Sequence, residues 1–534
     1  MGAGASASTI TEELSVASMA STASVDDLKA ALMALPTESQ AKIQAALVTT
    51  DNGTALVLCG PVIGTVTDTT ANVLLEVDES GSYKCTATAL AGSEHRVTVS
   101  CDLKAEVPGV FTLTALLPGT AYSIAFEGLA PAQDDELTAR GCVVRTLPTK
   151  IERLRLAAVS CDYPSRLPWD IPTDWSPWKA LAAKCADGEY DVMLHLGDQV
   201  YTWENGCMLA AVRAMDLGLS DKATLPLRAK MEARASLSLQ ESYRNVWGQT
   251  WCAKALAHAS HLMIWSDNDV TNDFTSAYEP DGVTQTYKAD YLRVATRVYH
   301  LYQKQLRRPD LSAELTELGP VPPNPTRLEE WAEQSYGWCA VFMIDMRGNH
   351  IDNAGVLAPP DAPTLSAAQK AALEAAFAKP GVRCMVVCAE IPFVGPTPEG
   401  ARSGAEKLPF LKEHWPYLLD ELLWLLDLCF TWKAASAGRE VLLLAGDIHV
   451  GVDSLITDAT TGLTIRHITT SSITNAISKF FNPLEGALSE RYSYTHKVLD
   501  GLHNYADLDL KLMPDGATVE AKVELVGVPI PAKE

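Results

Sequence analysis

Several features are missing from this chain, and each absence excludes a class of protein. No stretch of about 18 uninterrupted apolar residues occurs, so no transmembrane helix is predicted. No secretory signal is recognisable before residue 50, because the first basic residue is Lys29 and no apolar segment follows the start. A G-x-S-x-G nucleophile elbow and a P-loop are both lacking, which leaves little support for a serine hydrolase or a nucleotide kinase.

Paired cysteine motifs and excess positive charge are also lacking. The 12 cysteines show no repeated spacing, and Cys384 and Cys388 do not form a CxxC pair. We therefore expect reduced, buried thiols, no structural zinc site and a cytoplasmic protein. The formal net charge of −23 argues against nucleic acid as a partner, because no field attracts phosphates at long range. A small anionic substrate would need local positive charge, and metal ions are one source of it.

The amino terminus matches a lipidation pattern. Residues 1–6 read Met-Gly-Ala-Gly-Ala-Ser, which fits the M-G-x-x-x-[ST] signal for N-myristoylation of Gly2. The alternative is a flexible start rich in small residues. One myristoyl chain binds membranes only marginally, and neither a cysteine before Cys59 nor a polybasic cluster offers a second anchor. We expect at most weak, reversible membrane association.

The 534 residues are too many for one ordinary core, and the pattern changes along the chain. Residues 1–23, rich in Ala, Ser and Thr, predict a disordered tail, and residues 24–50 predict a short helical hairpin. Residues 54–147 contain short Val-, Thr- and Leu-rich runs between turns. This pattern predicts about seven strands in an all-β sandwich domain of the fibronectin/Ig type, with Tyr122 in a tyrosine corner.

Residues 151–534 alternate strands with helical stretches, which predicts a layered α/β (α+β) domain. Helices are expected at residues 364–377 and 415–432, and a closing hairpin at 505–527. Near-continuous apolar runs predict six strands of a buried sheet. These runs are residues 154–159, 192–196, 262–265, 341–344, 382–389 and 441–445.

Four of the six runs end abruptly in side chains that can bind metal ions. A single acid after a strand is usually a helix cap, but ligands of α/β sheets bind beyond the carboxyl ends of strands, so four such ends should converge. Carboxylates gathered in one crevice repel strongly unless divalent or trivalent cations neutralise them. The four ends are Ser160-Cys161-Asp162, Gly197-Asp198-Gln199-Val200-Tyr201, Ser266-Asp267-Asn268-Asp269 and Gly446-Asp447-Ile448-His449.

The ordered set of motifs resembles the PhoD-like (alkaline phosphatase D) metallophosphatase family. Besides the four strand ends, Asp345-Met346-Arg347 and Thr470-Ser471-Ser472 match the family and follow in its order. A sandwich domain ahead of the catalytic domain is similar too. The resemblance implies a metallophosphoesterase-type layered sheet in residues 151–534. It also implies hydrolysis of small phosphomonoesters or phosphodiesters by a metal-activated hydroxide.

The resemblance further implies a binuclear or trinuclear metal centre that holds iron with calcium, or other divalent ions. Cys161, Asp198 and Tyr201 would ligate the transition metal, because thiolate and phenolate are anionic donors suited to it. Asp198 would bridge the metals, and the remaining ligands would be Asp267, Asp447 and His449. The alternatives are an inert core thiol for Cys161 and an ordinary rim aromatic for Tyr201.

Three residues are candidates for direct catalysis: Asn268, His449 and Arg166. Relatives carry an Asp-Asp-His-Asp or Asp-Asp-His-Glu run where this chain has Ser266-Asp267-Asn268-Asp269. Asn268 can donate hydrogen bonds but cannot transfer a proton, and losing a general acid typically costs roughly 10²- to 10⁴-fold in rate. Arg166 is expected either to clamp a phosphate oxygen or to form a surface ion pair.

Two alternatives to an active hydrolase follow from these residues. One is a degenerate family member that binds metal and phosphate with little turnover, and the other is an adhesion or scaffold protein led by its sandwich domain. Around the site, Asp345 and Arg347 are expected to pair with each other, and Ser471 and Ser472 to line the rim. His195 and His261 are expected to be core histidines, and the weaker site candidates are Asp273, Asn475 and His503.

Overall fold

The computed structural model describes residues 53–90, 94–167, 172, 174–202, 225–270, 287–311, 329–348, 364–479 and 483–531. Residues 55–534 form one compact unit. The predicted tail with Gly2, the predicted hairpin at residues 24–50 and Asp273 lie outside the described residues. Within the described ranges, no helix is long and apolar enough to span a membrane.

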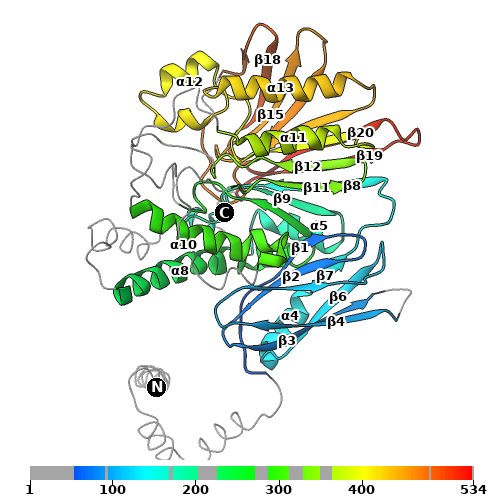
Figure 1. Ribbon diagram of the computed structural model, residues 1–534, viewed down its shortest axis with the longest axis vertical. Helices are drawn as coiled ribbons and strands as arrows, with labels where there is room; N and C mark the ends of the chain where they lie inside the picture. Colours follow the sequence, from blue (N-terminus) through cyan, green and yellow to red (C-terminus); the bar gives the residue numbers. More distant parts are fainter. Residues whose placement is uncertain are drawn as a thin grey trace, which may run out of the picture. The chain divides into compact units, whose positions relative to one another are not determined.

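Two antiparallel sheets form the first part of this unit (Figure 1). The first has the order β1-β2-β5, with β1 at Val57–Val66, β2 at Ala71–Val77 and β5 at Gly109–Leu113. The second has the order β4-β3-β6-β7, with β4 at Arg96–Leu103, β3 at Gly81–Ala89, β6 at Ala121–Glu127 and β7 at Val143–Arg145. One apolar cluster joins Val73 and Leu75 of the first sheet to Cys85 and Phe126 of the second. Helix α4, Pro131–Arg140, was not indicated by the sequence pattern.

Tyr122 makes the backbone contact that is expected of a tyrosine corner. Its hydroxyl accepts a 2.8 Å hydrogen bond from the backbone nitrogen of Leu117, five residues earlier. The same hydroxyl lies 3.0 Å from Nδ1 of His95. The Tyr122 ring is buried at the start of β6, and its hydroxyl group still has hydrogen-bond partners.

The two amino-terminal sheets share an apolar core with the region that follows. Cys59, Val62 and Leu74 belong to the same cluster as the apolar residues of the strand at residues 154–159. The chain also approaches closely at Gly64, where a Cβ atom would lie 2.2 Å from the carbonyl oxygen of Leu306. Asn72 Nδ2 donates a 3.0 Å hydrogen bond to the same oxygen. Polar groups at this junction are therefore satisfied across it.

Two further sheets build the larger part of the unit. One has five strands in the order β10-β9-β8-β19-β20, at Ser260–Ile264, Val192–Leu196, Arg153–Val159, His503–Leu512 and Val519–Val528. The other has eight strands in the order β11-β12-β13-β14-β16-β15-β18-β17. Their bounds in that order are Ala332–Tyr336, Cys339–Met343, Cys384–Cys388, Glu440–Ala445, Thr464–Thr469, Gly451–Asp458, Tyr492–Leu499 and Glu485–Ala487.

All six predicted apolar runs are strands, but they belong to two sheets rather than one. Strands β8, β9 and β10 are parallel neighbours in the five-stranded sheet, whereas β12, β13 and β14 are parallel neighbours in the eight-stranded sheet. Adjacent residues of β12 belong to different apolar clusters. Val341 lies in the cluster that contains the five-stranded sheet, and Phe342 lies in a second cluster on the other face of β12. A strand buried on both faces gives the same apolar run in either sheet, so sequence alone could not separate them.

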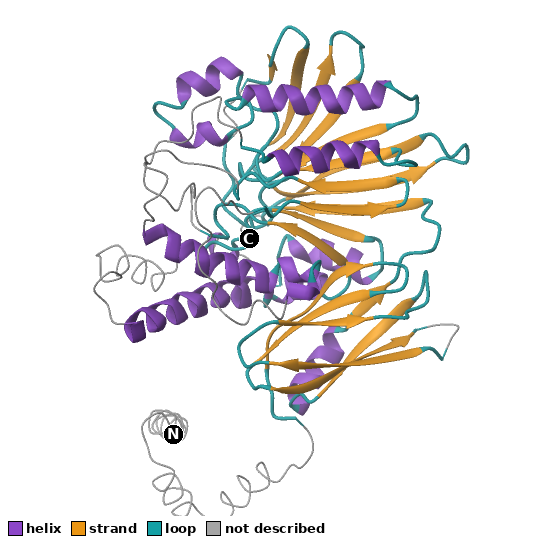
Figure 2. Ribbon diagram, viewed as in Figure 1, coloured by secondary structure: helices purple, strands orange, loops and turns teal. Residues whose placement is uncertain are grey.

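Helices cover the outer faces of both sheets (Figure 2). The predicted helices correspond to α11, Ala367–Ala378, and α13, Leu419–Ala434, and the predicted hairpin to β19 and β20. Ser366 caps the start of helix α11, because its side chain accepts a 3.0 Å bond from the backbone nitrogen of Gln369. The other helices are η1 Pro164–Arg166, α5 Trp178–Ala186, α8 Leu225–Trp247, α9 Thr250–Leu256, α10 Tyr287–Tyr302, η3 Lys304–Leu306, α12 Pro398–Gly404 and η5 Pro409–Glu413.

Candidate metal centre

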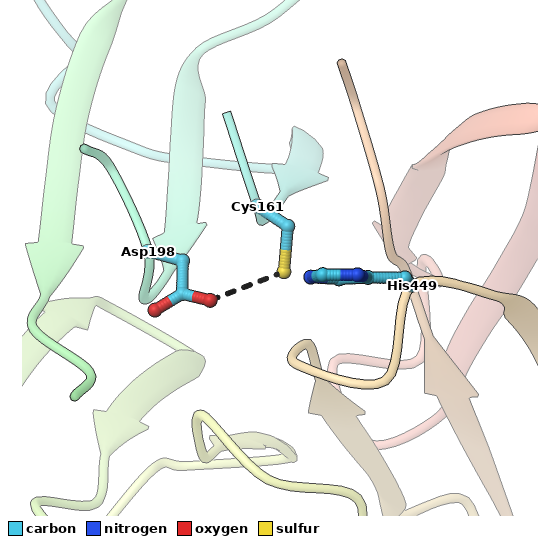
Figure 3. A group of neighbouring side chains, drawn as sticks. All are labelled: Cys161, Asp198 and His449. Atoms are coloured by element: carbon cyan, nitrogen blue, oxygen red, sulfur yellow. Dashed lines mark hydrogen bonds between the residues drawn. The ribbon is translucent and has the colours of Figure 1, made fainter. Parts of the chain in front are cut away.

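The strand ends that carry the predicted ligands meet between the two large sheets. Cys161, Asp198 and Asp267 follow β8, β9 and β10, whose parallel pairing brings their carboxyl ends to one edge. Asp447 and His449 follow β14 of the facing sheet. Figure 3 shows Cys161, Asp198 and His449 pointing toward one another from three separate loops. The expected convergence is therefore present, although it uses strands of both sheets.

The backbone is strained at four of the six predicted ligands. The φ angles are 58° at Cys161, 57° at Asp198, 71° at Asp447 and 55° at His449. Such left-handed conformations cost L-residues roughly 1–2 kcal/mol each. Among the described residues, the only other non-glycine positions with positive φ are Glu106 and Ala115. Strain gathered where the strands end is typical of a functional site.

Gly446 allows the end of β14 to approach the five-stranded sheet. A Cβ atom at this position would lie 2.1 Å from Oγ of Ser160 and 2.8 Å from the carbonyl oxygen of Leu196. Any side chain would therefore push the Asp447 loop away from Cys161. The small residue is required by this close approach rather than by a special φ angle.

One donor group contains a thiol, a carboxyl and an imidazole. Ligand atoms of Cys161, Asp198 and His449 all lie within 4.8 Å of one another. The Cys161 sulfur is 3.5 Å from Oδ2 of Asp198. Tyr201 joins this group, because its hydroxyl donates a 2.8 Å bond to the same Oδ2 and lies 3.0 Å from Nε2 of His449.

A second donor group consists of three carboxyl groups. Oxygen atoms of Asp198, Asp267 and Asp447 lie within 4.8 Å of one another. Asp198 and Asp267 are buried, with 1% and 5% of their surface exposed. Since Asp198 belongs to both groups, it stands where a bridging ligand would be needed.

Three acidic groups of this centre resist ionisation: the Asp198 carboxyl, the Cys161 thiol and the Tyr201 phenol. Burial, followed by the charges of Asp267 and Asp447, raises the pKa of Asp198 well above its usual value. Burial and Asp198 likewise raise the pKa of both the Cys161 thiol and the Tyr201 phenol. Cations would remove this repulsion and favour the anionic forms that ligate metals. Burial lowers the pKa of His449 to about 4, which keeps the imidazole neutral and able to coordinate. The donor set therefore fits a metal centre.

Comparison with known families supports this interpretation. The PhoD-like phosphatase family matches residues 156–498. This chain belongs to that family. The solved structure of PhoD is similar with a TM-score of 0.56 and 12% identity, and the match covers 86% of this chain and 91% of that chain. At this identity the likeness shows the fold alone.

Two other comparisons add nothing to the family assignment. No curated protein matches the chain. A Paenibacillus sp. cycloisomaltooligosaccharide glucanotransferase, complexed with cycloisomaltoheptaose, is 9% identical over 90% of this chain and 69% of that chain, with a TM-score of 0.16. This score is too low to indicate a shared fold.

Asn268 points toward the two donor groups. Its amide nitrogen donates to Oδ2 of Asp198 at 3.3 Å and to Oδ1 of Asp267 at 3.2 Å. Its backbone nitrogen donates to the same Asp267 oxygen at 2.9 Å. Asn268 therefore stabilises these carboxyl groups by hydrogen bonds, and this role requires no proton transfer.

Arg166 lies at the exposed edge of the site. Its charge contributes to the lowered pKa of His449, after the larger effect of burial. The guanidinium carbon is 5.6 Å from the centre of the Tyr163 ring. Tyr163 in turn stacks on Tyr201, with ring centres 4.9 Å apart. An exposed cation beside the ligand cluster stands where an anionic substrate would approach.

Asp345 and Arg347 do not form the side-chain pair that the sequence suggested. Asp345 Oδ1 accepts bonds from the backbone nitrogens of Arg347 and Gly348, at 3.0 and 2.9 Å, and from Trp265 Nε1 at 2.9 Å. The Arg347 guanidinium turns instead toward three other carboxylates. It lies 3.7 Å from Asp267, 2.8 Å from Glu390 and 2.6 Å from Glu413. The Asp345 carboxylate thus holds the backbone of its own loop, while the Arg347 guanidinium contacts Asp267 of the second donor group.

Glu390 and Glu413 were missed by sequence reasoning. Glu390 comes directly after the apolar run that contains β13, so the same strand-end signal could have found it. Glu413 lies in the short helix η5 and carries no such signal. Burial raises the pKa of Glu413 to about 8, although the nearby Arg347 acts in the opposite direction.

The remaining candidates have structural contacts around the site. His195 Nε2 lies 2.9 Å from His261 Nδ1, and both residues are buried, as expected for core histidines. The prediction that Ser471 and Ser472 line a rim was wrong, because both are fully buried. Ser471 Oγ donates to the Cys161 sulfur at 3.1 Å, and no local motif could reveal a contact between residues 310 positions apart.

Of the two weaker candidates that the structure describes, only Asn475 contacts a predicted ligand directly. Its Nδ2 lies 3.2 Å from Nε2 of His449. His503, by contrast, is buried at the start of β19, and its ring centre is 6.0 Å from that of Trp175. Asn475 therefore belongs to the surroundings of the donor groups, and His503 to the packing of the sheet.

Proposed function

We propose that this chain hydrolyses small phosphomonoesters or phosphodiesters at a binuclear or trinuclear metal centre. The observation that carries the proposal is the sharing of Asp198 by two donor groups of different chemistry. Thiol, phenol and imidazole suit a transition metal such as iron, and carboxylates suit calcium or another divalent ion. Metal ions bound there would supply a water of lowered pKa and positive charge to stabilise the phosphoryl oxygens.

The chain's own residues have separate tasks in this proposal. Cys161, Tyr201 and His449 would hold the first ion with Asp198, and Asp267 and Asp447 would hold the second. Arg166, at the exposed edge, orients a phosphate oxygen of the substrate by a charge-assisted hydrogen bond. Asn268 holds the carboxylates of Asp198 and Asp267 in place and offers no proton to the leaving group, so esters of acidic alcohols are the favoured substrates.

The test is metal analysis of the purified protein followed by hydrolysis of aryl phosphate monoesters and diesters. We expect bound metal, hydrolysis of at least one class of ester, and loss of both in Asp198→Asn. Asp458→Asn is a matched control, because Asp458, the last residue of β15, is buried, forms an ion pair with Arg491 and belongs to neither donor group. It should keep both metal and activity.

Two outcomes would favour other functions. Bound metal with no hydrolysis of either ester class would point to a degenerate family member that binds metal and phosphate, for which Asn268 is the motivating residue. A protein without metal, whose stability does not change on chelation, would point to a scaffold. We also propose that strands β1–β7 are a sandwich domain of the fibronectin/Ig type, with a supporting role.

A further inference from the structure

Asp269 lies two residues after the predicted ligand Asp267, yet its carboxylate faces backbone groups. Oδ2 accepts 2.9 Å hydrogen bonds from the backbone nitrogens of both Asp198 and Ser266. Oδ1 accepts a 3.2 Å bond from the backbone nitrogen of Gln199. The side chain is 1% exposed. Asp269 therefore ties together the two loops that follow β9 and β10 and carry the shared ligand and its neighbour.

Two side chains from outside these loops, Gln303 and Tyr243, also donate hydrogen bonds to Asp269. Gln303, just after α10, donates a 2.9 Å bond from Nε2 to Oδ1 of Asp269. The same nitrogen lies 2.9 Å from the Tyr243 hydroxyl, which itself is 3.5 Å from that Oδ1. Each oxygen of Asp269 thus has at least two donors, which leaves the carboxylate little capacity to ligate a metal ion.

The contacts continue from Tyr243 into the amino-terminal sheets. Tyr243 stacks on Tyr302, with ring centres 4.3 Å apart and an interplanar angle of 7°. The Tyr302 hydroxyl donates a 2.6 Å bond to Oε2 of Glu76, which is fully buried on β2. Arg244, next to Tyr243 on α8, holds Oε1 of Glu76 at 2.7 Å. A continuous series of contacts therefore joins β2 to the metal-ligand loops.

We propose that Asp269 is a positioning residue for the metal centre, and that Glu76 of the amino-terminal sheets fixes it through Tyr302, Tyr243 and Gln303. The proposal rests on the metal centre of the proposed function. Asp198 has a strained φ of 57°, and the bond from its own nitrogen to Asp269 helps to hold that conformation. Partners that orient metal ligands typically change metal affinity by about 10- to 100-fold when they are removed.

The first test uses Asp269→Asn, which places an NH₂ donor opposite backbone N–H donors. Co²⁺ is titrated into the folded, metal-stripped protein, and binding is followed by calorimetry and by thiolate-to-cobalt absorption from Cys161. We expect affinity to fall by about 10- to 100-fold. The control Asp458→Asn removes an equally buried carboxylate on β15, and it should lower thermal stability without changing Co²⁺ affinity or absorption.

Two milder variants test the other contacts between Glu76 and Asp269. Glu76→Gln removes the charge that pairs with Arg244, and Gln303→Met removes the amide donor to Asp269 at similar volume; each should weaken Co²⁺ binding several-fold. If Asp269→Asn does not fold, Gln303→Met decides the role of Asp269 in its place. Wild-type Co²⁺ affinity in a folded Asp269→Asn or in Gln303→Met would overturn the positioning role. Wild-type affinity in Glu76→Gln would overturn the part assigned to the amino-terminal sheets.

These outcomes are separate from those of the proposed function. A wild-type protein that binds Co²⁺ but hydrolyses no ester would disprove catalysis and leave the positioning test intact. A wild-type protein that binds no Co²⁺ would overturn the metal centre and, with it, the positioning role.

Discussion

The Tyr201 hydroxyl donates a 2.8 Å hydrogen bond to Oδ2 of Asp198, the oxygen that lies 3.5 Å from the Cys161 sulfur. Three groups that ionise to anions therefore surround one point. Burial raises the pKa of all three groups. The charge of Asp198 adds to this effect at Cys161 and Tyr201, whereas the charges of Asp267 and Asp447 add to it at Asp198. A metal ion bound there must displace their protons, so binding should release protons to the solvent.

Tyr201→Phe tests whether the phenol is a ligand rather than a rim aromatic. The substitution keeps the ring that stacks on Tyr163 and removes the oxygen near Asp198 and His449. We expect affinity for a transition metal to fall at least about tenfold, measured by titration of the metal-stripped protein. Tyr494→Phe is the control, because that buried hydroxyl donates to Gly395 away from the donor groups. Equal affinities in both variants would rule out ligation by Tyr201.

Asn268→His introduces the residue that the family resemblance leads one to expect at this position. A histidine can protonate a leaving group, and we expect turnover of alkyl phosphates to rise by up to about 10²-fold, with a smaller gain for aryl phosphates. The measurement is kcat for a series of esters that differ in leaving-group pKa. No gain for any ester would show that this site works without a general acid at position 268.

Arg347→Met leaves the buried carboxylates Glu390 and Glu413 without their cation. Removing one partner of a buried charge network typically costs about 3–5 kcal/mol, and we expect the free energy of unfolding to fall by that amount. Adding Glu413→Gln should recover part of the loss, since an amide then replaces the buried carboxyl group that has lost its partner. Arg466→Met, which breaks a half-exposed pair with Asp453, should cost less than about 1 kcal/mol in chemical denaturation.

Glu330→Gln should change how stability depends on pH. Burial alone would raise the pKa of Glu330, but His300, Lys304 and Arg307 together lower it to about 2, whereas an unfolded Glu titrates near about 4.3. A lowered pKa stabilises the fold above pH 4.3, and this contribution is lost as the pH falls toward 2.

We therefore expect Glu330→Gln to cost about 3 kcal/mol at pH 7 and progressively less below pH 4.3. Denaturation of the metal-stripped protein at several pH values measures the difference. The exposed neighbour Glu329, changed to Gln, is the control and should have little effect at any pH. A loss that stayed constant down to pH 2 would contradict the assignment of the effect to the Glu330 charge.

The positions of the strands followed from local pattern more readily than their pairing did. β9 has the bounds of its apolar run, Val192–Leu196, and β14 differs by one residue from the run at 441–445. The division of β8–β10 and β12–β14 between two sheets was not predictable, because strands buried on both faces lack the alternation that marks which side faces a partner. Helix α8 also went unpredicted, and its apolar face is defined only by packing on the sheets.

The sequence by itself determined which side chains are candidates for the metal centre. Abrupt changes from apolar runs to Cys161, Asp198, Asp267 and Asp447 are properties of neighbouring residues, so they can be read without coordinates. Only the tertiary structure decided the supporting residues. Glu413, Arg347 and Asp269 acquire their roles from partners that lie far along the chain, and only the folded backbone sets those distances.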